Sequence, residues 1–380
     1  MDFELSETHQ LLADSARRFL RDELPFDERM RIATSRAGFS RQLWKRGADL
    51  GLLAALFDED HGGLGGSGND IALIFQAIGQ VLAPQPFLES LIAGRIVAAS
   101  TASEDILPSV IAGDLLLSPA LYERHTRYEL GQVTTFAEMS SDGWRLSGEK
   151  AVVRFARQSA LLIVPALTVG DELGLFLVPP DQLGVTVRDY PLIDGGRGGE
   201  VVLRDVALER EARLEFERPA LEVIESAVAA GIVGLCAEAV GIMDFVRDAT
   251  VDYLRTRVQF GQPIGTFQAL QHRMATLAIE IEQARSAMIN AASRLADNPS
   301  LRTPPIAAAK FTIDRVSTIV SEEAIQLHGA IGMTWDFPIG HYAKRLIMIG
   351  HSHGDEDHHL DQYIAARQVT KVSGHAFDEA

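Results

Sequence analysis

The middle of the chain, residues 116–218, differs in its hydrophobic pattern from the segments on either side. Short apolar runs follow one another there, separated by glycine or proline; they are residues 161–164, 175–178, 185–187 and 201–203. Runs of this kind, with turn residues between them, are typical of strands in an antiparallel sheet. The stretch therefore predicts a central antiparallel β domain.

The flanking segments show helical spacing instead. After the β-rich stretch, one apolar stripe advances in steps of four and three residues; it contains Leu235, Ala239, Ile242, Val246, Ala249 and Tyr253. Further helices are predicted at residues 39–53, 71–82, 269–295 and 306–327 and after Tyr342, and Ser6 is expected to cap the first helix. We therefore predict a multi-domain α+β chain: an N-terminal helical domain (1–115), the β domain (116–218) and a C-terminal four-helix bundle (219–380).

The charge balance excludes several classes of partner. The chain has 35 basic and 52 acidic side chains, a formal charge of −17, which argues against binding to nucleic acid or to anionic lipid. No uninterrupted apolar run approaches the ~20 residues that cross a bilayer. The single cysteine, Cys236, excludes an internal disulfide, and the acidic start does not look like a secretory signal. These features predict a cytoplasmic protein with small-molecule or protein partners.

The segment from Arg257 to Gln268 joins two predicted helices through a loop rich in glycine and proline. A guanidinium group presents a fork of donors suited to phosphate oxygens, and the N-terminus of the helix that Gln268 opens adds free N–H groups. The same spacing also suits a helix hairpin in which Arg257 binds a nearby carbonyl. Spacing alone leaves both interpretations open.

The segment from Gln326 to Pro338 begins at the end of another long helix. Gly329 is placed to end that helix in the left-handed conformation, and Gly332 allows a further change of backbone direction. Both glycines can serve only to turn the chain. They can also let the backbone approach a flat or charged ligand, with Gln326 as a donor.

Taken together and in this order, the two segments resemble the acyl-CoA dehydrogenase family, and the likeness covers essentially the whole chain. It is nearest to the small subunits of heteromeric bacterial enzymes of the pimeloyl-CoA dehydrogenase type, through residues 236–241, 268–272 and 340–345. The resemblance implies an acyl-CoA substrate, FAD as cofactor, electron-transfer flavoprotein as acceptor, and a homo- or hetero-oligomer with a larger subunit. It also implies an FAD cleft between the β domain and the bundle. Arg257, Phe260 and Gln268 are expected at the pyrophosphate, and Gln326 and Gly329 to Gly332 are expected from the neighbouring subunit.

The expected reaction needs a carboxylate that removes a proton beside the thioester carbonyl. Many family members carry a Glu-Gly pair on the loop that corresponds to residues 351–359 here, but aligning Gly354 with that glycine places His353 at the position of the base. Asp355 lies two positions from that place and is our prediction for the catalytic base. The alternative position used by some relatives falls on Gly231, and Glu225 lies nearly two turns earlier.

The β domain departs from the family as well. The Trp and Thr that members place beside the flavin correspond to Val152 and Arg154, and residues 120–124 replace an acidic Thr-Glu-Pro type motif. Two other functions therefore stay open: a non-catalytic subunit that completes the FAD site of a partner, and a flavin oxidase or monooxygenase of the same fold. The histidine-rich stretch 351–359 also has the composition of a metal site, but a solvated loop is the preferred interpretation, and we expect no metal.

Overall fold

The protein was analysed as a computed structural model, which describes residues 7–375. Ser6, the predicted cap of the first helix, lies outside the described residues. Within them the chain forms two compact units, each built from separate stretches of sequence. The helical unit contains residues 7–27, 67–83 and 232–375, and the sheet unit contains residues 28–66 and 84–231. The boundaries of the three predicted domains stay a prediction.

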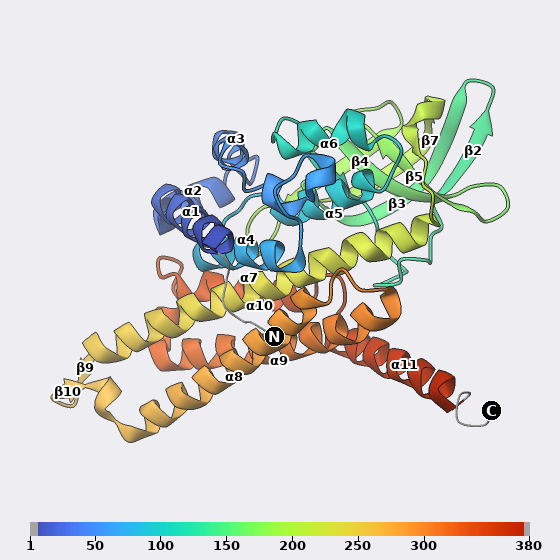
Figure 1. Cartoon of the computed structure of the whole chain (residues 1–380). Coiled ribbons are helices and arrows are strands. Elements are labelled where there is room, and N and C mark those ends of the chain that lie inside the picture. The colour runs from blue at the N-terminus through green and yellow to red at the C-terminus, as the bar shows by residue number, and fades with distance from the viewer. Residues whose placement is uncertain (1–6, 376–380) are drawn as a thin grey trace. The chain divides into compact units, whose positions relative to one another are not determined.

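The sheet unit is organised around one eight-stranded sheet with the order β6-β7-β3-β2-β4-β5-β8, in which β1 pairs with β4 (Figure 1). The strands are β1 (Leu117–Pro119), β2 (Phe136–Ser140), β3 (Gly143–Arg154), β4 (Leu161–Leu167), β5 (Leu173–Val178), β6 (Val185–Pro191), β7 (Arg197–Leu208) and β8 (Arg213–Leu214). The four apolar runs identified in the sequence lie in β4, β5, β6 and β7. The predicted strands are therefore present.

The sheet is mixed and not wholly antiparallel. Most neighbours are antiparallel, but β1 runs parallel to β4, and β2 pairs parallel to β4 at Phe136 and Leu167. Alternating polarity marks a strand without giving its direction, whereas a parallel neighbour needs a long connection. Here residues 120–160, which include the β2–β3 hairpin, supply the connection between β1 and β4. The sequence pattern therefore predicts the strands correctly, but it does not predict the parallel pairing of β1 and β2 with β4.

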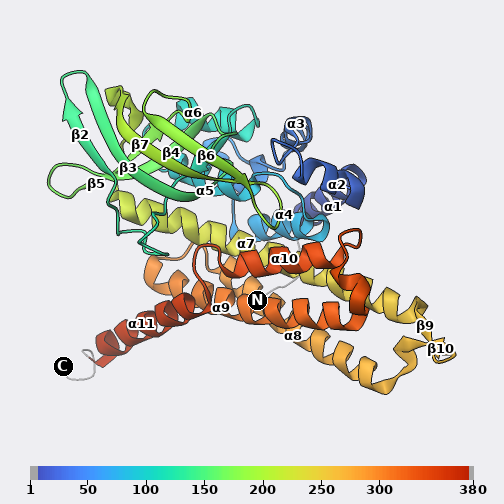
Figure 2. The same ribbon diagram turned by 180° about the vertical axis from the view of Figure 1, so that it is seen from behind.

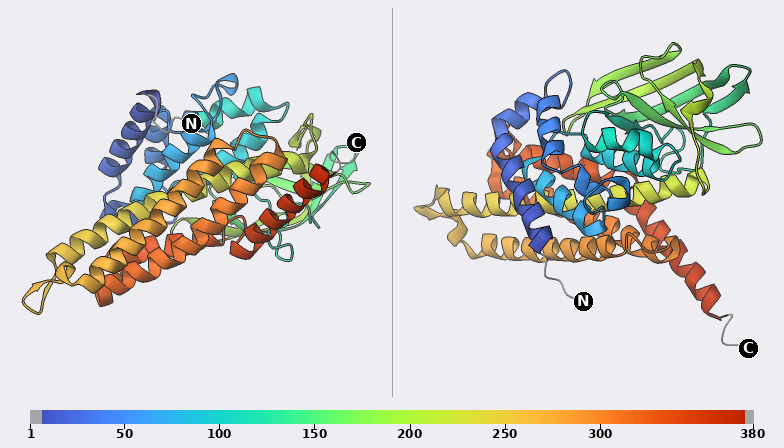
Figure 3. Two further views of the ribbon diagram at one scale, coloured as in Figure 1. Left: turned by 60° about the horizontal axis from the view of Figure 1, so that its bottom comes forward. Right: turned by 45° about the horizontal axis from the view of Figure 1, so that its top comes forward.

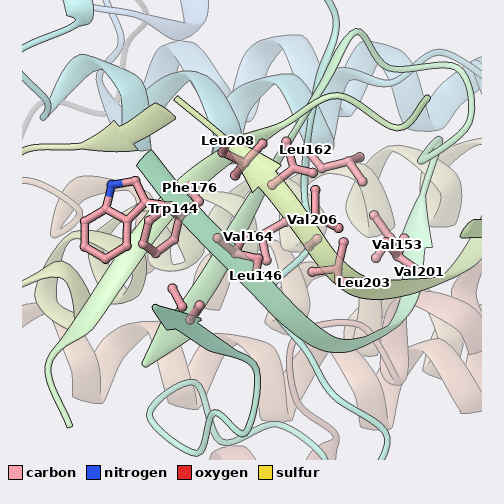
Figure 4. Close-up of a cluster of buried hydrophobic side chains, with 14 of the residues drawn as sticks. Trp144, Leu146, Val153, Leu162, Val164, Phe176, Val201, Leu203, Val206 and Leu208 are labelled. Carbon is pink, nitrogen blue, oxygen red and sulfur yellow. The ribbon is translucent and has the colours of Figure 1, made fainter. Parts of the chain in front are cut away.

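The core of the sheet unit is apolar and closely packed. Its fully buried members come from β2, β3, β4, β5 and β7 and from the segments beside them (Figure 4). Trp144 and Phe176 close one end of this cluster, with ring centroids 5.1 Å apart in an edge-to-face arrangement. Shorter elements complete the unit; they are α3 (Arg41–Asp49), η1 (Ala54–Leu56), η2 (Glu59–His61), α5 (Phe87–Ala98), α6 (Ser103–Ile111) and η3 (Arg210–Ala212).

The helical unit contains the predicted bundle. Its long helices are α7 (Ala220–Thr256, shared with the sheet unit), α8 (Gln268–Ser293) and α9 (Pro299–His328), and α8 and α9 lie side by side (Figures 2 and 3). Two helices, α10 (Ile339–Gly350) and α11 (Glu356–His375), stand where one fourth helix was predicted. The unit also contains α1 (Glu7–Glu23), α4 (Gly68–Val81), β9 (Val258–Gln259), β10 (Gln262–Pro263), η4 (Ile264–Thr266) and η5 (Gly329–Met333), and α2 (Phe26–Ala33) begins in it.

Helices α4 and α7 approach each other through glycine. A Cβ atom added to Gly79 would clash with the carbonyl of Glu238, and one added to Gly241 would clash with the carbonyl of Gln76. Nearby, the Tyr342 hydroxyl donates to the Gln80 carbonyl at 2.7 Å. Only glycine permits so short a separation of two helical backbones.

Helix α7 is long and apolar enough, by length and composition, to cross a membrane. Of its most apolar window, however, 89% is buried inside the fold. The apolar character of α7 is therefore accounted for by its central position among packed elements.

Candidate functional site

The first motif forms the end of α7 and a tight hairpin. Arg257 follows the last residue of α7, and its N–H still donates to the Tyr253 carbonyl at 2.8 Å. β9 and β10 pair antiparallel around Phe260 and Gly261, whose φ angles are +53° and +79°. Two successive residues with positive φ form the primed turn that a two-residue hairpin requires, and glycine at the second position suits it. The hairpin thus fixes the direction in which the chain leaves Arg257.

The side chains of this hairpin face solvent. Phe260 is 90% exposed, and Arg257 and Gln268 are also exposed. Among residues 7–375 no carboxylate lies within ion-pair distance of the Arg257 guanidinium. Gln268 is the first residue of α8, as predicted, and the helix has no side-chain cap. The N–H groups of Phe267 and Leu270 already donate to the carbonyls of Ile264 and Phe267, so those of Gln268 and Ala269 are the ones that a ligand can use. The Arg257 guanidinium is therefore free to bind a ligand, whereas the Arg257 carbonyl accepts a hydrogen bond from the Ile264 N–H at 2.9 Å across the hairpin.

The second motif lies at the same end of the helical unit. Gly329 ends α9, as predicted, but with φ +65° and ψ −145° it does not have the left-handed helical conformation that was expected there. Gly332 is buried in η5 and has no positive φ angle. The His328 ring stacks on Tyr253 with centroids 4.6 Å apart. Because Arg257 lies one turn beyond Tyr253, this contact brings the two motifs together within a single chain.

The end of the helical unit where the two motifs meet, residues 257–268 and 326–332, is called the shared end. It has the properties of a site for a dinucleotide. It presents a guanidinium for phosphate, an exposed amide on Gln326, an exposed ring on Phe260, and open space beside Gly329, where an added Cβ would meet nothing within 4 Å. The residues therefore fit a flat, anionic cofactor such as FAD. The predicted division of these residues between two subunits is not required by the geometry, since one chain can present both motifs.

Asp355, the predicted base, is the residue that precedes α11. Its carboxylate accepts a hydrogen bond from the His358 N–H at 3.0 Å, which is the contact of a helix N-cap. Its side chain is half-buried. The following Glu356 and Asp357 are acidic residues in the first turn of α11. Asp355 followed by two acidic residues is a sequence signal for the start of a helix as much as for a catalytic base.

The other histidines of this stretch do not lie together on one face of a helix. His353 lies before α11 in a left-handed conformation (φ +56°), so it does not share a helical face with Asp357. His359 is buried and its Nε2 lies 3.1 Å from the His353 carbonyl. Burial, the Lys310 charge and His358 lower the pKa of His359 to about 3. Across residues 7–375 no group of three His, Cys, Asp or Glu side chains is arranged to hold a metal ion.

Lys310 of α9 is fully buried beneath this loop. Its Nζ lies 2.9 and 2.7 Å from the two carboxylate oxygens of Asp314 and 2.9 Å from the carbonyl oxygen of Gly354. Burial raises the pKa of Asp314 to about 7, although the Lys310 charge opposes that change. A lysine and an aspartate four residues apart on a helix usually lie on an exposed face, so the spacing of Lys310 and Asp314 does not indicate a buried cluster.

The two β-domain positions that correspond to the Trp and Thr of relatives differ in character. Val152 is 57% exposed and has φ +51°, because a bulge between β3 and β7 interrupts the register there. Arg154 binds the Glu89 carboxylate at 2.9 Å and that of Asp194 at 3.5 Å. Neither residue reproduces the ring or the hydroxyl that it replaces.

The sheet unit also contains a buried ion pair that no local sequence pattern indicates. Lys150 donates to Glu123 at 2.7 Å, and the Glu123 carboxylate also accepts hydrogen bonds from Thr134 and Thr135. Burial raises the pKa of Glu123, but these hydrogen bonds outweigh it and bring the pKa down to about 2. Burial also lowers the pKa of Lys150, to about 8. The pair joins β3 to the segment that precedes β2.

The order of helices, mixed sheet and helices is the framework within which the comparisons with known proteins are read. Two family models match the chain: the N-terminal domain of acyl-CoA dehydrogenase over residues 6–114 and the C-terminal domain over residues 221–367. The chain belongs to the acyl-CoA dehydrogenase family, a family of oxidoreductases.

Individual relatives agree with this result over nearly their whole length. The probable acyl-CoA dehydrogenase YngJ of Bacillus subtilis (strain 168) is 28% identical, over 98% of this chain and 100% of the relative. A chain of the ChsE4-ChsE5 complex from Mycobacterium tuberculosis is 25% identical with a TM-score of 0.86, over 97% of this chain and 99% of that one. A chain of a variant of the Tcur3481-Tcur3483 steroid ACAD is 28% identical with a TM-score of 0.86, over 96% and 99%.

Proposed function

We propose that this chain is a subunit of an FAD-dependent acyl-CoA dehydrogenase that introduces an α,β double bond into a CoA thioester. The observation that carries the proposal is the meeting of the two motifs at one end of one chain, around the Tyr253–His328 stack. Membership of the acyl-CoA dehydrogenase family supports the reaction class. We propose electron-transfer flavoprotein as the acceptor and the cytoplasm as the location.

In this proposal each residue has a separate task. Arg257 binds the pyrophosphate through charged hydrogen bonds, each worth roughly 1.5–3 kcal/mol. Phe260, Gln268, Gln326 and the backbone from Gly329 to Gly332 surround the rest of the dinucleotide. FAD, when bound, supplies the acceptor for the hydride that leaves the substrate. The carboxylate of Asp355 removes the proton from the carbon next to the thioester carbonyl.

The positions of these residues support an oligomer. The η5 segment and Asp355 are separated by α10, whose 12 residues span about 18 Å. The hairpin of β9 and β10 and helix α11 lie at opposite ends of the helical unit (Figure 1). If Arg257 and Asp355 serve the same reaction, each site draws on two subunits. We propose a homo-oligomer or a hetero-oligomer with a larger subunit of the pimeloyl-CoA dehydrogenase type of assembly.

A second function has its own support. Asp355 already caps α11, and no glutamate occupies either position that relatives use for the base. The chain can therefore be a non-catalytic subunit that presents Arg257 and Gln326 to a flavin whose base lies on its partner. The ChsE4-ChsE5 complex of Mycobacterium tuberculosis among the similar structures supports an assembly of two different chains. A third function, a flavin oxidase or monooxygenase of the same fold, is supported by Val152 and Arg154, which stand where relatives have a Trp and a Thr beside the flavin.

Replacing Arg257 tests the flavin site directly. Arg257→Ala should reduce the flavin retained per subunit after purification by at least tenfold at limiting FAD, since one charged hydrogen bond of about 1.5 kcal/mol already corresponds to a factor of ten. Arg255→Ala is the matched control, because Arg255 is also exposed at the end of α7 and lies outside the motif contact. Equal flavin content in the two variants would contradict the assignment of Arg257.

A further inference from the structure

The loop between α10 and α11, residues 351–355, accepts a hydrogen bond from a buried side chain of a third helix, α9. The Nζ of Lys310, on α9, lies 2.9 Å from the Gly354 carbonyl oxygen and 3.5 Å from that of Gly350. Lys310 and Asp314 are 0% and 6% exposed in their side chains. A buried ammonium group is stable only when its donors are all satisfied, so these carbonyls are part of the ion-pair site and not incidental neighbours.

The loop has little freedom once Gly354 is fixed. Gly354 is buried with φ +119°, and a Cβ atom added there would clash with the His359 ring. The His359 Nε2 lies 3.1 Å from the His353 carbonyl oxygen on the other side. Gly354 therefore packs between the Lys310 ammonium group and the His359 ring in the first turn of α11.

The next residue along the chain is Asp355, whose carboxylate accepts from the His358 N–H at 3.0 Å and whose carbonyl accepts from the His359 N–H at 3.1 Å. The peptide plane that joins Gly354 to Asp355 contains the carbonyl that Lys310 binds. Rotation of that plane would move Asp355 out of its position at the start of α11. One hydrogen bond from α9 thus sets where α11 begins.

We propose that Lys310 is a positioning residue, which through the Gly354 carbonyl holds Asp355 in the orientation that the reaction uses. The inference rests on the proposed function, in which Asp355 is the base. Lys310 itself does not contact substrate or cofactor in this account. We call the contact between the Lys310 ammonium group and the Gly354 carbonyl the clamp. Asp314 balances the positive charge of Lys310, so that the clamp does not leave an unpaired cation in the core.

The test compares two double variants that each replace one buried ion pair by apolar side chains. Lys310→Met with Asp314→Leu removes the clamp without leaving a lone charge. Arg345→Met with Glu238→Leu is the control, because that pair is also buried and joins α10 to α7. Each protein is studied as the flavin-loaded complex, by hydrogen exchange of residues 351–359 and by steady-state kinetics. The substrate probe is the saturated CoA ester that gives the largest thermal shift in a panel of short, long, dicarboxylic and steroid esters.

The clamp variant should lose exchange protection at residues 355–359 by at least tenfold and lose kcat by at least tenfold, with KM within about threefold of the parent. The control variant should keep both the protection and kcat. Unchanged protection in the clamp variant, or an equal loss in the control, would overturn the role of Lys310. If Asp355→Asn retains full turnover while the clamp variant still loses protection, the assignment of the base fails and the clamp stands.

Discussion

Asp355 caps α11 in the structure and is the base in the proposed function, and a single substitution can separate these two roles. As an N-cap it needs only a side-chain oxygen that accepts from the His358 N–H, and asparagine does this about as well as aspartate. As a base it needs a carboxylate. Asp355→Asn should therefore leave the thermal midpoint within a few degrees of the parent and lower kcat by roughly 100-fold or more.

Asp355→Ala is the useful companion, because it removes both roles and should also destabilise the protein by about 1 kcal/mol. Turnover that survives in Asp355→Asn would contradict the base assignment and favour the non-catalytic subunit. A midpoint that falls equally in both variants would mean that asparagine does not replace the cap.

The lowered pKa of Glu123 predicts that the free energy of unfolding depends on pH in the acidic range. Its pKa in the folded protein, about 2, lies below the ordinary value of 4.5, so folding favours its charged form. The stabilisation is therefore present above pH 4.5 and is lost as the pH falls through that value toward 2. The difference in unfolding free energy between the parent and Glu123→Gln should shrink steadily when urea denaturation is repeated from about pH 6 down to about pH 3.

Glu138→Gln, on an exposed site of β2, provides the comparison and should show no such trend. A Glu123→Gln difference that stays constant over the same range would show that the Lys150 and threonine contacts do not hold the carboxylate in its charged form.

At the scale of elements, the sequence predicted most of what local patterns determine. The apolar runs of β4 to β7, the start of α8 at Gln268 and the end of α9 at Gly329 were all expected, because each depends on neighbouring residues alone. The parallel pairing of β1 with β4 and the clamp from Lys310 to Gly354 were not expected. Both join residues more than 40 positions apart, and a single sequence carries no signal for which distant segments meet.

The glycine contact between α4 and α7 gives a prediction for element packing. Gly241→Ala should destabilise the protein by about 1–3 kcal/mol, because its Cβ would overlap the Gln76 carbonyl and force the helices apart. Gly350→Ala is a fair comparison, since its Cβ would meet Asp314 only at an ordinary 3.9 Å. Thermal unfolding of the two variants decides the matter: equal midpoints would contradict the close approach of the helices.

At the scale of the whole molecule, the charge of −17 places a constraint on how anionic ligands bind. FAD and a CoA ester both carry phosphates, and an acidic surface does not attract them. In the proposed function, binding therefore depends on a few positioned donors such as Arg257, at the shared end of the bundle, where the two motifs meet. A second subunit is the simplest source of the remaining contacts, since Asp355 lies beyond α10 from that end.

The central claim is that this acidic chain contributes to an FAD-dependent oxidation of an acyl-CoA. The most direct measurement is the visible spectrum of the purified protein under argon, before and after addition of each saturated CoA ester in the panel. We expect a yellow protein whose flavin absorption decreases on addition of at least one ester. A protein that binds flavin but keeps its full absorption with every ester, alone and when assembled with a larger subunit, would contradict it.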